Sequence, residues 1–215
     1  MNWRIVLFTF LLTAIAAPVF PAAPQSRAEA LRALQSADAQ TRAEAVVWLA
    51  NRGTIADAPL LDARLRDDNP VVRGVAEQGL WLLWGRSGDP AVDELMARGV
   101  ATLQAGRQGE AIELFSRVIR AKPDFAEGWN KRATAYFLAG EYARSIADCD
   151  EVLKRNPRHF GALSGLGQIY VHLQRYEQAL AWFHRALEVN PNLTDVEREM
   201  VHIESLLKEQ RPTTI

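Results

Sequence analysis

The stretch FGALSGLGQIYVHLQRYEQALAWFHRALEVNPNL, residues 160–193, decides the fold. Its apolar residues recur every three or four positions in two runs, which is the spacing of one face of a helix. The polar pair Gln174-Arg175 separates the runs, and Pro191 follows the second one. The stretch therefore predicts two helices joined by a short turn, with the proline ending the unit.

The same unit occurs twice more upstream, at an interval of 34 residues. Its ends are marked by Pro123, Pro157 and Pro191, and Phe115 and Cys149 share a phase with Phe183 in the stretch above. Small residues stand where the two helices of a pair must approach closely; they include Ala133, Ser145, Gly167 and Ala179. Three copies of one helix pair predict a stack in which neighbours bury each other's apolar faces.

These units resemble tetratricopeptide repeats, whose pattern is W-x2-L-G-x2-Y, then A-x3-F, A and P. The third unit meets the pattern at Leu163, Leu166, Gly167, Tyr170, Ala179, Phe183, Ala186 and Pro191. The second keeps Trp129, Ala133, Tyr136 and Pro157 but departs from the pattern at Arg132, Ser145 and Cys149. The first has Thr102 where an aromatic residue is expected. The resemblance implies three units over residues 91–193.

A second repetition, at an interval of 31 residues, occupies residues 27–86. The matched residues are Leu34, Asp38, Arg42, Ala45 and Leu49 in one copy and Leu65, Asn69, Arg73, Ala76 and Leu80 in the other. Each copy resembles a HEAT-like repeat, in which an Asp or Asn caps a helix and the following Arg supports the turn. The alternative is four amphipathic helices whose match is partly chance.

The remaining segments complete an all-α solenoid of antiparallel helix pairs, with about eleven helices. Gly85 to Pro90 (GRSGDP) separates the two arrays with turn residues. Residues 194–210 carry Val196, Met200 and Ile203 on one face, which predicts a helix that caps the last repeat.

Residues 1–23 have the features of a secretory signal followed by a linker. Arg4 gives a positive start, residues 5–17 are apolar, and Ala14 and Ala16 fit a small-residue cleavage site. We expect cleavage after about Ala16, export, and a periplasmic mature chain that is not embedded in a membrane. The alternative is an uncleaved N-terminal anchor, although three prolines near its end argue against a continuous helix.

The composition and motifs favour no catalytic chemistry. The chain has 215 residues, with 25 basic and 26 acidic ones spread evenly, so no strong field would attract nucleic acid. Its four histidines lack metal-site spacing, and no phosphate-binding or nucleophile motif occurs. We therefore expect no enzyme activity, cofactor or metal. Cys149 is expected in the core, and Asp148, Asp150 and Glu151 on a solvated helix face.

The resemblance implies a concave groove lined by the first helix of each tetratricopeptide unit. By phase, the groove positions are Asp93, Met96, Val100, Leu103, Glu127, Asn130, Lys131, Thr134, Phe137, Gly161, Ser164, Gln168 and Val171. Family members that grip a terminal carboxylate use Lys, Asn and Arg at set positions, and only Lys131 matches by type.

We therefore expect a scaffold that binds a segment of another protein in this groove. The apolar stripe of Met96, Val100 and Leu103 could instead be covered by the N-terminal array or the chain's own tail. Two alternatives remain: an accessory subunit that positions an envelope-assembly enzyme, and a self-associating structural solenoid. Nothing in the sequence predicts the oligomeric state or names the partner.

Overall fold

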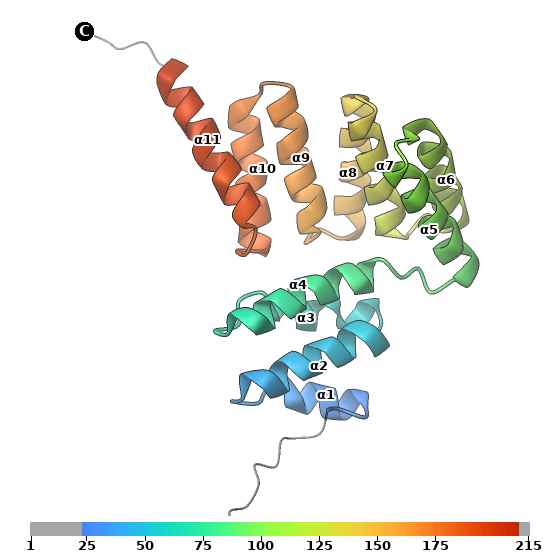
Figure 1. The fold of residues 1–215 in the computed structure, drawn as a ribbon, viewed down its shortest axis with the longest axis vertical. Coiled ribbons are helices and arrows are strands. Elements are labelled where there is room, and N and C mark those ends of the chain that lie inside the picture. The colour runs from blue at the N-terminus through green and yellow to red at the C-terminus, as the bar shows by residue number, and fades with distance from the viewer. Residues whose placement is uncertain (1–22, 211–215) are drawn as a thin grey trace, which may run out of the picture.

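The computed structural model describes residues 23–210, and these residues form eleven α-helices with no strand among them (Figure 1). The helices are α1 (Arg27–Ala33), α2 (Ala39–Arg52), α3 (Ala58–Arg64), α4 (Pro70–Trp84), α5 (Pro90–Gln104), α6 (Gln108–Ala121), α7 (Ala126–Leu138), α8 (Tyr142–Arg155), α9 (Phe160–His172), α10 (Tyr176–Val189) and α11 (Thr194–Gln210). A short 3₁₀ turn, η1 (Ile55–Asp57), precedes α3. The predicted all-helical solenoid is confirmed. The expected signal sequence lies outside the described residues.

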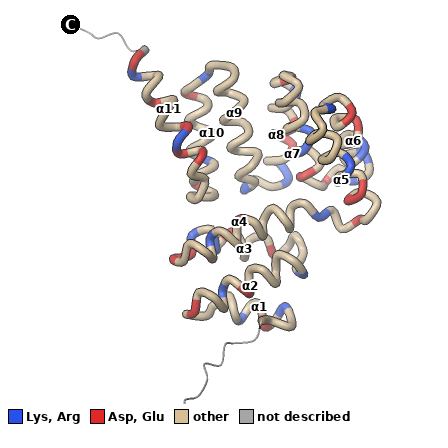
Figure 2. The backbone as a smooth tube through the Cα atoms, viewed as in Figure 1, with Lys and Arg blue, Asp and Glu red and all other residues tan. Residues whose placement is uncertain are grey.

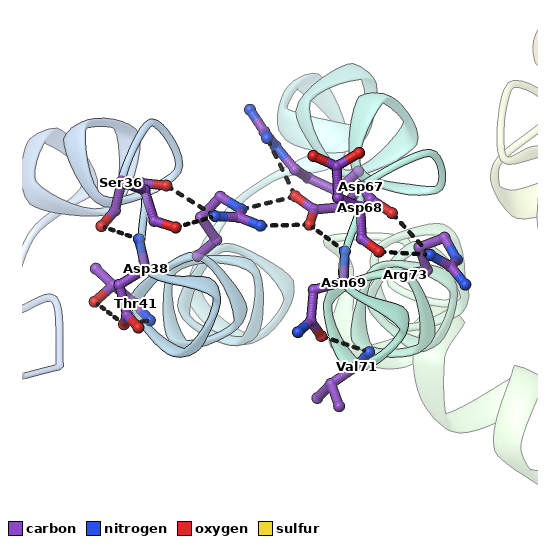
Figure 3. Close-up of polar contacts among 11 residues, drawn as sticks. Ser36, Asp38, Thr41, Asp67, Asp68, Asn69, Val71 and Arg73 are labelled. Atoms are coloured by element: carbon purple, nitrogen blue, oxygen red, sulfur yellow. Dashed lines mark hydrogen bonds and ion pairs between the residues drawn. The ribbon is translucent and has the colours of Figure 1, made fainter.

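The four N-terminal helices, here called the N-terminal module (α1–α4), are joined by capped turns. The carboxylate of Asp38 accepts a hydrogen bond from the backbone N–H of Thr41, and Asn69 accepts one from Val71 (Figure 3). The Arg42 guanidinium donates to two carbonyls of its own turn and makes a two-pronged contact with Asp67 at 2.6 and 2.8 Å. The hydrogen bond from Arg42 lowers the pKa of Asp67 to about 2.

Arg73, one 31-residue interval after Arg42, makes the corresponding contacts in the next turn and also contacts a residue beyond the N-terminal module. Its guanidinium donates to the carbonyls of Asp67 and Asp68, as Arg42 does in its own turn. Its Nε donates to Asn192 Oδ1 at 2.9 Å, and Asn192 Nδ2 donates back to the carbonyl of Leu65 at 2.8 Å. Arg42 thus contacts the next turn of the module through Asp67, and Arg73 contacts the turn between α10 and α11 through Asn192.

The 34-residue repeats form the expected helix pairs α5–α6, α7–α8 and α9–α10. The turn inside each pair has one residue with positive φ: Gly106, Gly140 and, in the third pair, Gln174. Glycine adopts this conformation without steric cost, which explains its use in the first two turns. Trp129, Tyr136 and Tyr170 are partly buried, as stacked pairs require.

The core column of the repeats is Phe115, Cys149 and Phe183, all of them buried. Opposite the two phenylalanines stand Gly99 and Gly167, and a Cβ atom at either glycine would overlap the facing ring. Opposite Cys149 stands Ala133. Each repeat thus combines a large side chain with glycine, or a smaller one with alanine, at the point where its two helices approach most closely.

The middle repeat contains an ion pair where the repeat pattern has an apolar contact. Arg132 Nε and one terminal nitrogen bind the two carboxylate oxygens of Asp148 at 2.7 and 2.8 Å, and Asp148 is only 4% exposed. The prediction that Asp148 lies on a solvated face is wrong, because its partner Arg132 is on α7 and draws it inward. Ser145 Oγ donates a hydrogen bond to the carbonyl of Ala133. The two polar residues that depart from the repeat pattern, Arg132 and Ser145, are therefore both hydrogen-bonded within the middle repeat.

The N-terminal module packs against the repeats instead of only preceding them. Helix α4 crosses the ends of the repeat helices in Figure 1, and Phe160, Leu163 and Val189 belong to the same buried cluster as Leu83 and Trp84. At its other end the solenoid is covered by α11, as predicted, through Val196, Met200 and Ile203. Among the described residues, no helix is both long and apolar enough to cross a bilayer.

Candidate functional site

The groove positions nearest the N-terminal module are engaged within the chain. Asp93 Oδ1 accepts a hydrogen bond from the backbone N–H of Ser87 at 2.8 Å. Glu127 is 3% exposed, and its carboxylate contacts His159 Nε2 and Lys131 Nζ, each at 3.0 Å. Gly161 lies directly beneath the ring of Trp81 from α4. Asp93 and Glu127 are therefore engaged within the chain, and Trp81 covers Gly161 on the side where a Cβ would stand.

The Glu127–His159 contact has a defined hydrogen-bond direction. His159 Nδ1 accepts from the backbone N–H of Ala162 and caps α9, so the ring proton is on Nε2 and is donated to Glu127. Burial raises the pKa of Glu127, but the hydrogen bond from His159 and the charge of Lys131 outweigh burial, and the pKa lies below its ordinary value. The pair serves to join α7 to α9 rather than to react with a substrate.

The apolar stripe predicted in the first repeat is buried at Met96 and partly exposed at Val100 and Leu103. Met96 is buried in a cluster with Phe115 and Phe125, and Val100 and Leu103 are partly buried against the same cluster. These three side chains therefore pack against the core of the first repeat, in a cluster that includes no residue of the N-terminal module.

An open cavity of about 160 Å³ lies between α7 and α9. Its lining residues are Asn130, Ala133, Thr134, Phe137, Ser145, Cys149, Gly161, Gly165, Gln168 and Ile169. Four of them, Asn130, Thr134, Phe137 and Gln168, are groove positions predicted from the repeat phase. Apolar cavities of about 150 Å³ can bind benzene, so this volume fits one side chain of the size of Leu, Ile or Phe.

The walls of this cavity carry no charge. Helix α9 contains no Lys, Arg, Asp or Glu and is tan throughout in Figure 2, and the same is true of α7 after Arg132. The side chains of Gln168 and Thr134 are not buried; the Gln168 amide can donate and accept, whereas the Thr134 hydroxyl donates to the carbonyl of Asn130 at 3.0 Å and can only accept from a partner. The site can therefore hold an apolar side chain while hydrogen-bonding to the backbone that carries it.

The remaining predicted groove positions flank the cavity without lining it. Ser164 and Val171 are partly buried on α9, and Ser164 Oγ donates to the carbonyl of Gly161. Phe137 meets His172 edge-on, with 4.9 Å between ring centroids. Three residues near the site were not predicted from the sequence: His159, His172 and Trp81. The sequence cannot indicate that Trp81 lies near the site, because its position depends on how α4 packs against the repeats.

The site offers no reactive group. Burial raises the pKa of the Cys149 thiol to about 12, so the thiolate is scarce at neutral pH. The expected core position of Cys149 is confirmed by its 3% exposure. In residues 23–210, no three His, Cys, Asp or Glu side chains are grouped so that they could hold a metal ion.

Comparison with known proteins finds similarity to one family of helical repeats in the part of the chain that carries this site. A tetratricopeptide repeat family model matches residues 96–153 and 130–193. A TPR repeat-containing protein of Rhizobium etli is 36% identical over 126 residues, which cover 59% of this chain and 62% of the relative. The small glutamine-rich tetratricopeptide repeat-containing protein 2 of Mycosarcoma maydis is 28% identical over 46% of this chain. The chain spans less than two thirds of either relative, with only 28% of the second covered.

Solved structures show the same fold. The first TPR domain of Spaghetti (RPAP3), bound to the HSP90 peptide SRMEEVD, has a TM-score of 0.52 and 27% identity, covering 54% of this chain and 93% of that domain. The first TPR domain of human RPAP3 has a TM-score of 0.53 and 26% identity, covering 57% of this chain and 97% of that domain.

Proposed function

Because residues 96–193 of this chain match a tetratricopeptide repeat family model, we propose that the protein is a non-enzymatic scaffold whose groove holds an apolar segment of another protein. The observation that carries the proposal is the uncharged cavity between α7 and α9. The similar domain of Spaghetti was solved with a peptide bound, which supports a peptide as the class of ligand. The partner segment inserts one apolar side chain beside Phe137, and Thr134 and Gln168 hydrogen-bond to its backbone.

Gly165→Leu tests this proposal because it fills the cavity without disturbing the fold. A Cβ at Gly165 meets no atom within 4 Å, and Gly165 lines the cavity. Peptides selected on the wild-type protein from a random heptapeptide display library should bind the variant roughly 10- to 150-fold more weakly, the equivalent of losing about 1.5–3 kcal/mol of apolar burial. Isothermal titration calorimetry measures this difference. The melting temperature should rise slightly, since leucine favours helix over glycine by about 0.5–1 kcal/mol.

Gly74→Leu is the matched control. Gly74 is exposed within α4, and a Cβ there also meets no atom within 4 Å, but the residue lies outside the cavity. This variant should gain similar helix stability and keep wild-type affinity. Equal peptide affinity for Gly165→Leu and Gly74→Leu would rule out the cavity as the binding site, as would a library that yields no peptide for the wild-type protein.

We also propose that the N-terminal module is a pair of HEAT-like repeats. The contact between Arg42 of one copy and Asp67 of the next supports it, since such an arginine links neighbouring turns in the resemblance described above. Arg42→Lys should lower the stability of the whole chain measured by urea unfolding, because lysine lacks the planar, two-pronged donor geometry. Unchanged unfolding would argue against this role for the arginine.

We further propose that the protein is exported and that its N-terminal segment is removed after about Ala16. The support is the charged start at Arg4, the apolar residues 5–17 and the alanines at 14 and 16. The intact mass of the chain purified from its native host should correspond to a protein that begins at Ala17. A mass that includes Met1 to Ala16 would contradict cleavage and favour the anchored alternative.

A further inference from the structure

The edge of the groove that faces the N-terminal module is filled by the chain itself. In each repeat the groove position nearest this edge is engaged: Asp93 by the backbone of Ser87, Glu127 by His159 and Lys131, and Gly161 by Trp81. A bound segment has access only to the positions farther along each helix. Of these contacts, the one made by the N-terminal module is that of Trp81, so the module covers the groove at Gly161.

Trp81 makes the closest of these contacts. Its indole lies on Gly161 so tightly that a Cβ there would overlap the ring, and it meets His159 and Phe160 edge-on at 5.5 and 5.2 Å between centroids. The ammonium of Lys131 lies 5.8 Å from the centroid of the same indole. The indole therefore covers Gly161 and flanks the ammonium of Lys131, whose side chain is 33% exposed.

Lys131 is also neutralised by a buried carboxylate. Its ammonium pairs with Glu127 Oε1 at 3.0 Å, and Glu127 is almost fully buried. The part of α7 beyond Arg132 and all of α9 lack charged residues, so they provide no other cation beside the cavity. A segment with a free carboxylate and acidic side chains would lose hydration at this site without gaining an opposite charge.

Building on the proposed function, we propose that Trp81 is a specificity-determining residue of the groove. Together with Glu127, it engages the ammonium of Lys131 within the chain, so the groove accepts an internal, uncharged apolar segment and rejects an acidic chain terminus. The residue that sets this preference belongs to α4 of the N-terminal module, outside the repeats that form the groove.

The test uses the acidic peptide SRMEEVD as the probe and a variant that exposes Lys131. Trp81→Ala removes the indole cover, and Glu127→Gln removes the neutralising charge while its amide oxygen can still accept the hydrogen bond from His159 Nε2. Fluorescence anisotropy with labelled peptide should show no saturable binding to the wild-type chain up to millimolar concentration. The double variant should bind at least tenfold more tightly than the wild type, and adding Lys131→Gln should abolish that gain.

Controls separate specificity from folding. Trp48→Ala truncates another partly buried tryptophan of the N-terminal module, which lines a different surface, and should leave SRMEEVD unbound. Trp81→Phe keeps an aromatic cover and should also leave it unbound. Because the double variant could fail to fold, Glu127→Gln alone is measured as well; with Lys131 no longer neutralised, it should bind SRMEEVD more tightly than the wild type.

Two results would overturn the inference. One is wild-type binding of SRMEEVD comparable to that of the double variant; the other is a folded double variant, judged by circular dichroism, whose affinity is unchanged. Both can occur while Gly165→Leu still weakens the binding of library peptides, in which case the cavity functions but Trp81 does not set its preference. Conversely, if the double variant binds SRMEEVD more tightly than the wild type and this increase in affinity is lost with Lys131→Gln, the inference is supported even if the library yields no peptide.

Discussion

Arg132→Leu is expected to lower the free energy of unfolding by about 3–5 kcal/mol, even though leucine is the residue that the repeat pattern has at this position. The substitution leaves Asp148, which is 4% exposed, without the guanidinium that binds both of its carboxylate oxygens. Removing one partner of a buried ion pair leaves an uncompensated charge, and that is the source of the cost. Urea unfolding followed by circular dichroism measures the difference.

The second-site variant Asp148→Leu should restore most of the loss. Replacing a buried ion pair by apolar residues of similar size is often neutral or stabilising, so the Arg132→Leu, Asp148→Leu chain should be close to the wild type. The difference between this pair and the single variants gives the coupling energy of the two residues. A stable Arg132→Leu variant, or a double variant no better than the single one, would contradict the role assigned to Asp148.

Phe183→Ala is expected to cost about 3–5 kcal/mol, because the ring is fully buried between α9, α10 and α11 and its removal leaves a cavity. Thermal and urea unfolding should both show the loss. Cys149→Ala, in the same column of the middle repeat, should cost much less because far fewer atoms are removed.

Gly167 provides an internal check on this packing. Gly167→Ala alone should destabilise the chain, since its Cβ would overlap the Phe183 ring, although alanine favours helix over glycine by about 1 kcal/mol. In the Phe183→Ala background the same change should become stabilising, because the ring that opposed the Cβ is gone. The same sign of effect in both backgrounds would show that Gly167 and Phe183 are not in the close contact described above.

The repeat phase predicts much of the fold and part of the site. Matched columns identify Phe115, Cys149 and Phe183 as core, and their interval gives the helix pairs. The spacing of apolar residues after Pro191 gives the capping helix α11. The same phase selects Thr134, Phe137 and Gln168, which line the cavity. These features follow from sequence because each depends on contacts within a unit or between successive units.

The rest depends on contacts between distant segments. The pattern of α8 alone predicts that Asp148 is a surface carboxylate, because its partner Arg132 is on α7. Glu127 is likewise predicted as a groove residue, because its partner His159 is one repeat away in the sequence. The place of Trp81 follows from how α4 docks across the repeats. Periodicity within a helix defines its faces but does not determine which non-neighbouring segment covers them.

The link from Arg73 to Asn192 joins residues 119 positions apart in the chain, and it has a consequence for the order of folding during synthesis. The side of α4 that bears Leu83 and Trp84 gains its cover from Phe160, Leu163 and Val189, all of which leave the ribosome much later. The first four helices therefore emerge from the ribosome with an apolar surface that stays exposed to solvent until the last repeat has been synthesised. A chain interrupted before Phe160 would keep that surface exposed and would be a target for chaperones.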